Sequence, residues 1–454
     1  MPTASRTSGD TPFAEPPTVR AEAGLLQTTL RVDWLEVGGA RYRTYNGAFV
    51  GPTLRFAPGD RVQALLDNAL PEPHGSHGGA HDGGNDPHGF DVTNLHTHGL
   101  WVSPAGNSDN VLIAVWPGDQ FQHDYLIPAE HVAGAFWYHP HRHGSVEEQV
   151  KTGMSGAILI EGGVDALPEV AAATDRVMVL QQLQPNSTTD EAAARDTLAE
   201  IAGPPDKVTT INALRRPTIE ARPGALERCR LIAANYHDIL HIEVTPVGGG
   251  EALPLHTIAQ DGIPVGAVRQ SARVRLGPGN RVDVMLRVPA SGDYVIRKIG
   301  DGSQFDVLPA DKDIGYLRVQ GAAVEPQTPI PTAFPATFSH PDIAPDEVTN
   351  RRKVLFSVID EPGGCVAFAI NNREFAPGRV DQSIELAVSE NCVGSLIYTP
   401  AIRISTARVI RSLWSATLPV RRKLDRRTAA IRRVARIKGL PSCRISGFRC
   451  RTAG

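Results

Sequence analysis

The sequence has no long apolar run. Its 454 residues contain no stretch close to the roughly 20 apolar residues that a membrane-spanning helix needs. Residues 1–20 hold Thr, Pro and Ala but lack the apolar core of a secretory signal peptide. We therefore expect no transmembrane segment and, as the sequence reads, a cytoplasmic protein. A periplasmic or secreted location would require a different start.

Cysteine is scarce, and histidine is missing from the end of the chain. The five cysteines are Cys229, Cys365, Cys392, Cys443 and Cys450. Their spacing is typical of neither a disulfide framework nor a zinc site. The last histidine is His340, so the last three cysteines have no imidazole near them in the sequence.

The composition is that of a globular chain rich in turns. Hydrophobic residues make up 41%, with 43 Gly and 36 Pro, which favours short strands. The length predicts about two to four domains. The net charge of −3 hides an asymmetry, because residues 387–454 carry 15 Arg or Lys against Glu390 and Asp425, giving +13. The rest of the chain therefore carries −16, since −3 minus 13 is −16.

Two His-x-His pairs stand out: His96-Thr97-His98 and His139-Pro140-His141. In extended backbone, residues i and i+2 project from the same face, so both rings of a pair can converge on one metal or on two adjacent ones. Imidazole is a good ligand for copper, zinc and iron. The aromatic run 136–138 before the second pair favours a strand. One pair alone could be chance, but two predict a metal site.

The sequence around these pairs resembles a known family. The segments 94–100 (NLHTHGL) and 136–144 (FWYHPHRHG), followed by Gln149-Val150 and by 153–156 (GMSG), resemble the first two copper motifs of the multicopper oxidases. The resemblance implies copper as cofactor, with His96 a ligand of the type 2 copper. It implies that His98, His139 and His141 ligate the type 3 pair.

An acidic residue follows at the spacing found in related laccases. Asp109 lies thirteen residues after His96, and the resemblance makes it a candidate proton relay. The alternative is a turn carboxylate that caps local backbone. Glu147 and Glu148 are weaker candidates for the same role.

An internal repeat divides the chain. The residues Pro52-Thr53-Leu54 and Pro58-Gly59 recur 165 positions later as Pro217-Thr218-Ile219 and Pro223-Gly224; a second match joins Pro117-Gly118-Asp119 to Pro278-Gly279-Asn280. Repetition at this length indicates duplicated domains. We predict an all-β fold of tandem Greek-key β-sandwiches, which the resemblance identifies as cupredoxin-like, two complete and a third truncated. The predicted parts are an N-terminal extension (1–27), domain 1 with the ligands (28–163), a spacer domain 2 without ligands (176–322), the start of domain 3 (350–386) and a basic tail (387–454).

The resemblance stops near residue 386. A complete family member carries a His-Pro-x-His-x-His motif and a His-Cys-His motif in its third domain, and the second of these cannot be present here. We therefore expect type 2 and type 3 copper but no type 1, or blue, copper. The tail is read either as a frame change or as a real basic extension able to bind a membrane surface or nucleic acid. Domain completeness favours the frame change.

The predicted function is that of a laccase-like oxidoreductase. Such an enzyme takes single electrons from phenolic or similar small donors and reduces dioxygen to water. We expect this chain to be inactive because its blue site is missing, and we expect no nucleic-acid partner. The alternatives are a copper-binding or sequestering protein without turnover and, less favoured, a nitrite reductase relative. The His-rich segment from His74 to His88 is either a loose copper site or a solvated insertion, the reading we favour.

Overall fold

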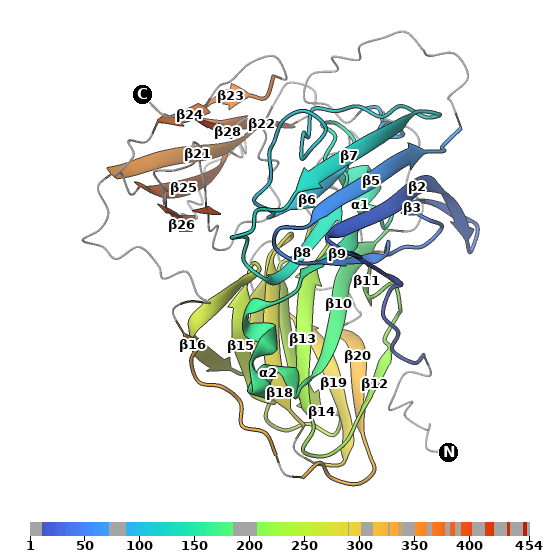
Figure 1. Cartoon of the computed structure of the whole chain (residues 1–454), viewed down its shortest axis with the longest axis vertical. Coiled ribbons are helices and arrows are strands. Elements are labelled where there is room, and N and C mark those ends of the chain that lie inside the picture. The colour runs from blue at the N-terminus through green and yellow to red at the C-terminus, as the bar shows by residue number, and fades with distance from the viewer. Residues whose placement is uncertain are drawn as a thin grey trace, which may run out of the picture. The chain divides into compact units, whose positions relative to one another are not determined.

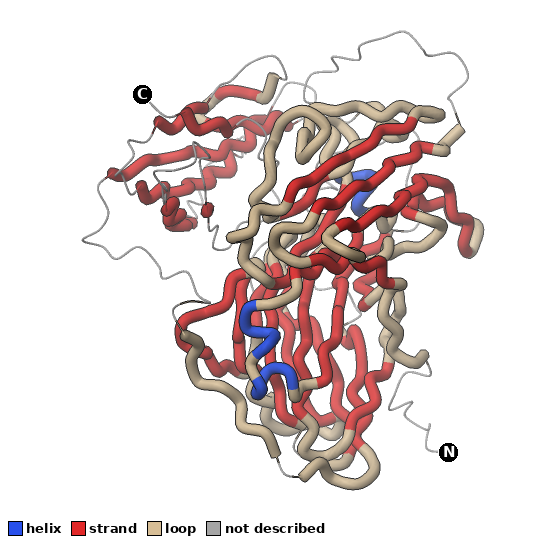
Figure 2. The backbone as a smooth tube through the Cα atoms, in the orientation of Figure 1, coloured by secondary structure: helices blue, strands red, loops and turns tan. Residues whose placement is uncertain are grey.

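The computed structural model describes fourteen segments of the chain. They are residues 11–71, 88–184, 207–288, 290–300, 312–325, 327–335, 337, 350–360, 366–376, 382–385, 392–401, 414–421, 434–435 and 448–451. Strands dominate these segments, with two short α-helices and one 3-10 helix (Figures 1 and 2). No helix among the described residues is long and apolar enough to cross a membrane.

The first sandwich is built from two sheets. One has the order β1-β4-β9-β8-β6 and the other β3-β2-β5-β7. Their strands are β1 (Thr18–Arg20), β2 (Leu25–Val37), β3 (Ala40–Tyr45), β4 (Thr53–Phe56), β5 (Arg61–Asn68), β6 (His96–His98), β7 (Gln120–Leu126), β8 (Gly134–His139) and β9 (Gly156–Ile160). Alternation in β5 turns Val62, Ala64 and Leu66 into the core, so this strand buries one face. The sandwich also takes in β1, which the sequence had placed in an N-terminal extension, because β1 pairs in parallel with β4.

The second sandwich repeats this plan. Its sheets have the orders β11-β10-β13-β18-β15-β16 and β12-β20-β19-β14-β17. Their strands are β10 (Thr174–Leu183), β11 (Val208–Ile211), β12 (Thr218–Ala221), β13 (Leu226–Ala233), β14 (Leu240–Pro246), β15 (Leu255–Gln260), β16 (Ile263–Ser271), β17 (Val274–Leu276), β18 (Arg281–Arg287), β19 (Gly292–Ile299) and β20 (Asp313–Val319). The parallel pairs β2–β5 and β4–β9 correspond to β10–β13 and β12–β20. The sequence repeat therefore corresponds to a repeat of strand pairing.

The two sandwiches pack against each other through their outer faces. One buried cluster joins Ala135 and Trp137 of β8 to Val177 and Val179 of β10. The intervening residues of β8 point into the core of the first sandwich. Both faces of β8 are therefore buried, which explains its unbroken run of apolar residues.

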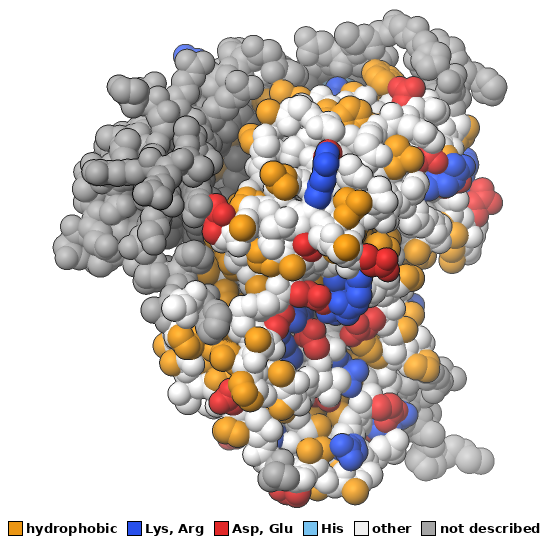
Figure 3. Space-filling model, viewed as in Figure 1, with side chains coloured by type: hydrophobic (Ala, Val, Ile, Leu, Met, Phe, Trp, Pro, Cys, Tyr) orange, Lys and Arg blue, Asp and Glu red, His pale blue; other side chains and the backbone are white. Residues whose placement is uncertain are grey.

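A charged segment connects the sandwiches. It contains the helices η1 (Gly163–Ala166) and α2 (Pro168–Ala171), whereas α1 (Val146–Lys151) lies within the first sandwich, between β8 and β9. Asp165 of η1 pairs with the buried Arg228 and Arg230 of β13. Nearby, Arg20 and Arg55 pair with Glu161, and acidic and basic side chains are mixed on this face (Figure 3). These ion pairs connect the linker to both sandwiches.

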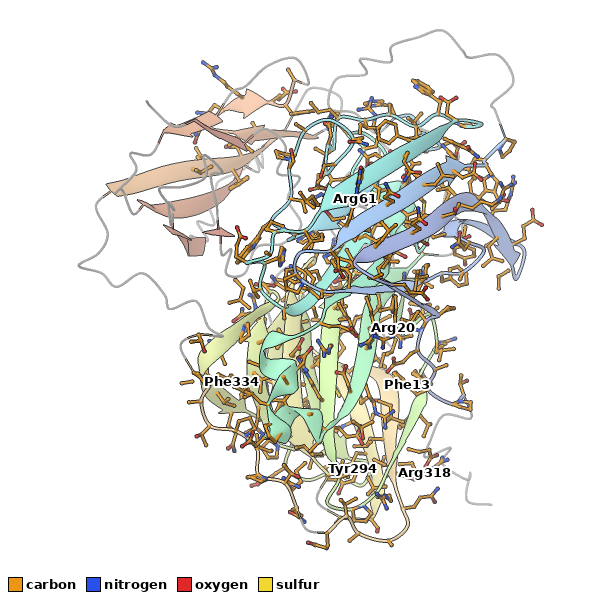
Figure 4. The ribbon with its side chains drawn as sticks, viewed as in Figure 1. Phe13, Arg20, Arg61, Tyr294, Arg318 and Phe334 are labelled. Carbon is orange, nitrogen blue, oxygen red and sulfur yellow. The ribbon has the colours of Figure 1, made fainter. Side chains whose placement is uncertain are left out.

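Aromatic residues from distant segments complete the second sandwich. Phe334 packs in a buried cluster with Val164 and Val170 of the linker helices. Phe13, near the N-terminus, packs against the second sandwich's core (Figure 4). The second sandwich is therefore covered by a segment near the N-terminus and by one that follows its own last strand, β20.

The C-terminal part contains a separate set of strands. One sheet has the order β23-β22-β21-β25-β26-β27, and β24 pairs with β28. The strands are β21 (Asn350–Asp360), β22 (Val366–Ile370), β23 (Arg373–Glu374), β24 (Gln382–Glu385), β25 (Cys392–Ala401), β26 (Trp414–Arg421), β27 (Val434–Ala435) and β28 (Phe448–Arg451).

Four of these strands, β25 to β28, fall in the predicted basic tail, which the resemblance does not cover. The segment 393–399 is rich in Val, Ile, Tyr and Thr, which suit strands, and β25 pairs in parallel with β21. The tail's side chains and most of the His74–His88 segment lie outside the described residues. That the tail leaves the third domain unfinished stays a prediction.

Candidate metal centre

The two His-x-His pairs meet at one edge of the first sandwich. Strand β6 pairs antiparallel with β8, placing His96 opposite His139 and His98 opposite Trp137. Alternation turns Thr97 toward the sandwich core, where it lines a small cavity, so His96 and His98 turn to the opposite face. Because β6 is the last strand of its sheet, the histidines lie at that sheet's edge.

The structure brings together all four predicted ligands. The ring centroid of His96 lies 5.6 Å from that of His98, 5.2 Å from that of His139 and 5.0 Å from that of His141. One ring nitrogen each of His96, His98 and His139 lie within 4.8 Å of one another. Across the described residues, these three form the one group of His, Cys, Asp or Glu side chains close enough to share a metal.

The spacing of the ring nitrogens fits a transition metal. Nδ1 of His98 and Nε2 of His139 are 3.2 Å apart. Imidazole nitrogens bind such ions at about 2.0–2.1 Å, so two nitrogens at this separation would subtend roughly 100° at a shared ion. A set of imidazoles suits copper or zinc better than calcium or magnesium, which prefer oxygen. The residues present therefore fit the predicted metal.

Two histidines are oriented through Nδ1. The His96 ring donates from Nδ1 to the Asp109 carboxylate, 2.9 Å from Oδ1 and 3.0 Å from Oδ2. The His139 ring donates from Nδ1 to the carbonyl of Pro140 at 2.8 Å. Both rings therefore present Nε2 to the cluster, as metal-ligating histidines with an oriented partner do.

Asp109 also contacts backbone, because the N–H of Thr97 donates to Oδ1 at 2.8 Å. The carboxylate of Asp109 therefore contacts both a histidine of the cluster and nearby backbone. Burial raises the pKa of Asp109, but the charge of His96 and its hydrogen bond outweigh burial, so the pKa lies below its usual value. Asp109 is in place to position His96, and its part as a proton relay stays a prediction.

Burial keeps two of the rings neutral. It lowers the pKa of His98 and of His139 well below the usual value, and charged neighbours, first Arg281 for His98 and His96 for His139, lower it further. Neutral imidazole is the form that binds metal.

Asn94 is a positioning residue that the sequence did not reveal. Its side-chain oxygen accepts the His141 N–H at 2.6 Å, and its amide nitrogen donates to the carbonyl of Val111 at 2.7 Å. Asn94 thus connects the His139–His141 pair to the loop that follows the His96–His98 pair. Its position two residues before His96, on the same face of an extended segment, was the available signal.

The other residues that the sequence singled out as possible ligands or proton relays are not part of this histidine cluster. Cys229 is buried in the core of the second sandwich, and burial raises the pKa of its thiol to about 12, so it stays protonated. Glu148 of α1 pairs with the buried Lys151, and burial raises the pKa of the Glu148 carboxyl. In the second sandwich the strand that corresponds to β8 is β19, which has no histidine.

Residues 90–164, which hold all four histidines, match the family model described as Multicopper oxidase. In this segment the chain is similar to the multicopper oxidases. Among its relatives is the cell division protein FtsP of Sodalis glossinidius, 22% identical over 305 residues that cover 65% of this chain and 58% of that protein. Another is the multicopper oxidase mco of Staphylococcus haemolyticus, 24% identical over 253 residues, 53% of this chain and 47% of that protein. The matches span about half the length of these relatives.

The fold is also similar to that of a solved structure. The laccase-like multi-copper oxidase CueO from Ochrobactrum sp. superposes with a TM-score of 0.65 at 21% identity, covering 86% of this chain and 83% of that one. The predicted all-β fold of tandem cupredoxin-like domains is confirmed.

Proposed function

We propose that His96, His98, His139 and His141 bind copper. The observation that carries this is the convergence of four imidazoles, two of them oriented through Nδ1. Bound copper would supply single-electron exchange and oxygen binding. The chain's own part is to hold the rings, keep those of His98 and His139 neutral and place the Asp109 carboxylate beside His96.

We infer that the ancestral activity is that of a laccase-like oxidase and that this chain lacks turnover. In the resembled enzymes electrons enter through a Cys-ligated copper, and no histidine follows His340. Cys229 is buried in the second sandwich and cannot take that part. Copper binding without oxidation of phenolic donors is the function that this arrangement supports best.

A second candidate follows from the relatives. Several matching proteins are named for cell division rather than oxidation. A chain without an electron-entry site could serve a binding role on the same fold, with no need for metal. Copper content separates this candidate from the first.

The test is metal analysis of purified protein reconstituted with copper, together with absorption spectra and oxidation of a phenolic donor. We expect bound copper, fewer than the roughly four ions of a complete enzyme, no intense blue band and negligible oxidation. His139→Ala should lose copper, whereas His256→Ala, on β15 of the second sandwich, should keep it. A blue, active protein would contradict the inactivity, and a protein without copper would favour the binding role.

The coding DNA tests the frame change directly. Translation of the other two frames after Leu386 should reveal the His-Pro-x-His-x-His and His-Cys-His motifs. If neither frame contains them, the basic tail is a real extension.

A further inference from the structure

A turn of the second sandwich lies against the His98 ring. Gly279, just before β18, has a φ of +83°. A Cβ added there would lie 2.8 Å from Cε1 and 3.2 Å from Nε2 of His98. Residue 279 must be glycine for two reasons: its φ is positive, and the His98 ring leaves no room for a Cβ atom. The second sandwich thus forms one wall of the space around a predicted ligand.

Arg281, two residues later, fixes this turn to the first sandwich. Its buried guanidinium donates from Nη1 to the carbonyl of Gly279 at 2.9 Å and from Nε to that of Ala135 in β8 at 3.3 Å. A Cβ at Gly99, the residue after His98, would lie 2.6 Å from Nη2 of Arg281. One side chain therefore bridges the turn, the strand that carries His139 and the end of the strand that carries His98.

The turn at Gly279 has a counterpart in the first sandwich. The duplicated turn in the first sandwich, Pro117-Gly118-Asp119, leads into β7 as Pro278-Gly279-Asn280 leads into β18. In the first copy the N–H of Gly118 donates to the carbonyl of Asn68, and in the second the N–H of Gly279 donates to that of Ala233. Each turn therefore makes the same kind of backbone hydrogen bond within its own sandwich. The second copy also packs on a histidine of the other sandwich.

We propose that the turn 277–281 is part of the metal centre and that metal binding is coupled to docking of the second sandwich on the first. Gly279 is a positioning residue that sets where the His98 ring lies, and Arg281 holds the turn in place. The domain expected to be only a spacer then affects metal affinity. By linkage, metal that binds the docked arrangement stabilises it, and a turn displaced from His98 weakens metal binding. The inference rests on the proposed copper binding.

The first test compares Gly279→Ala with Gly249→Ala in the full chain. Gly249 also has a positive φ, +89°, but nothing lies within 4 Å of an added Cβ, so it reproduces the backbone strain without the contact. We expect Cu(II) affinity, measured by competition with a chelator, to fall about tenfold or more in Gly279→Ala and to stay within about twofold in Gly249→Ala. The Cu(II) electron paramagnetic resonance spectrum should change in the first variant alone. Equal affinities and spectra in both variants would overturn the proposal.

The second test needs no variant and decides the matter if Gly279→Ala does not fold. Hydrogen exchange of the wild-type chain is measured with and without Cu(II). Protection of the amides of 279–281 on copper addition, with no change at 248–250, supports the proposal. Copper binding that leaves 279–281 unchanged overturns it. Absence of copper binding by the wild-type chain would instead refute the proposed function itself.

Discussion

At the scale of single residues, the metal centre depends on partners that are not ligands. Asp109 accepts from Nδ1 of His96, and a backbone carbonyl accepts from Nδ1 of His139. Each contact fixes a ring by its far nitrogen and leaves the near one for a metal. Orientation of the donors, as well as their number, therefore limits affinity.

Substitution of Asp109 tests this directly. Asp109→Asn keeps the shape of the side chain but removes the charge that accepts from His96, so we expect copper affinity to fall by about 10- to 100-fold. Competition titration with Cu(II) measures the change. Asp124→Asn serves as control, because Asp124 pairs with exposed Arg61 on β5 (Figure 4). An Asp109→Asn protein with unchanged affinity would show that the carboxylate does not position His96.

A second buried histidine predicts how stability depends on pH. His131 donates from Nδ1 to the carbonyl of Val132 at 2.8 Å, and its Nε2 accepts the N–H of Trp101 at 3.0 Å. Burial lowers its pKa from 6.5 to about 4. Because the unfolded chain takes up a proton near pH 6.5 and the folded chain does not, His131 makes stability fall as pH drops from 6.5 toward 4.

Denaturant unfolding at several pH values measures this effect. His131→Gln removes the titrating group, so the variant should lose less stability than the wild-type chain across this range, by about 3 kcal/mol in total. Above pH 7 the two curves should run parallel. Equal loss in both proteins would mean that another group controls the acid range.

At the scale of elements, strand β6 separates two functions by alternation. Thr97 faces the core, where its hydroxyl is buried with no hydrogen-bond partner among the described residues, whereas His96 and His98 face the metal centre. Register therefore decides which side chains reach the metal, because a shift of one residue would exchange the two faces.

Thr97→Val should separate these faces experimentally. Replacing a hydroxyl that has no partner by a methyl group removes a desolvation cost, so the free energy of unfolding should rise by up to about 1 kcal/mol. Copper affinity should not change. Thr97→Asp, which buries a charge in the same place, should destabilise the chain strongly. A loss of copper binding in Thr97→Val would show that residue 97 faces the metal.

At the scale of the whole molecule, the described part of the first two sandwiches behaves as one packed body. Their interface includes an apolar cluster across β8 and β10 and the buried Arg281. Glycine at position 134 allows β8 of the first sandwich to lie close to the turn before β16 of the second, since a Cβ at Gly134 would lie 2.2 Å from the carbonyl oxygen of Gly262. Because this neighbour is backbone, it cannot move aside without shifting a strand turn.

Gly134→Ala should therefore loosen the docking of the sandwiches. We expect the free energy of unfolding to fall by about 1–3 kcal/mol and the calorimetric transition to broaden or split. Gly248→Ala, where nothing lies within 4 Å of an added Cβ, should change stability by less than about 0.5 kcal/mol. A single sharp transition at unchanged temperature in Gly134→Ala would show that the interface does not couple the sandwiches.

Sequence alone determined the fold class and the four clustered histidines. The i, i+2 spacing places two rings on one face of any extended segment, and apolar alternation with Gly and Pro turns is a local property. The repeat likewise predicted that the second sandwich would share the plan of the first. The strands β25 to β28 lie in a part of the sequence that is strongly basic and has no histidine, although the segment 393–399 favours a strand.

Only the tertiary structure decided what surrounds the histidines. Asn94 reaches His141, and Gly279 and Arg281 reach the strands of His98 and His139, from distant parts of the sequence. Such contacts depend on how one sandwich packs on another and on which loops that packing brings together. No local pattern encodes them: a Pro-Gly turn occurs in both sandwiches, and the sequence of the second copy does not reveal that Gly279 lies against His98.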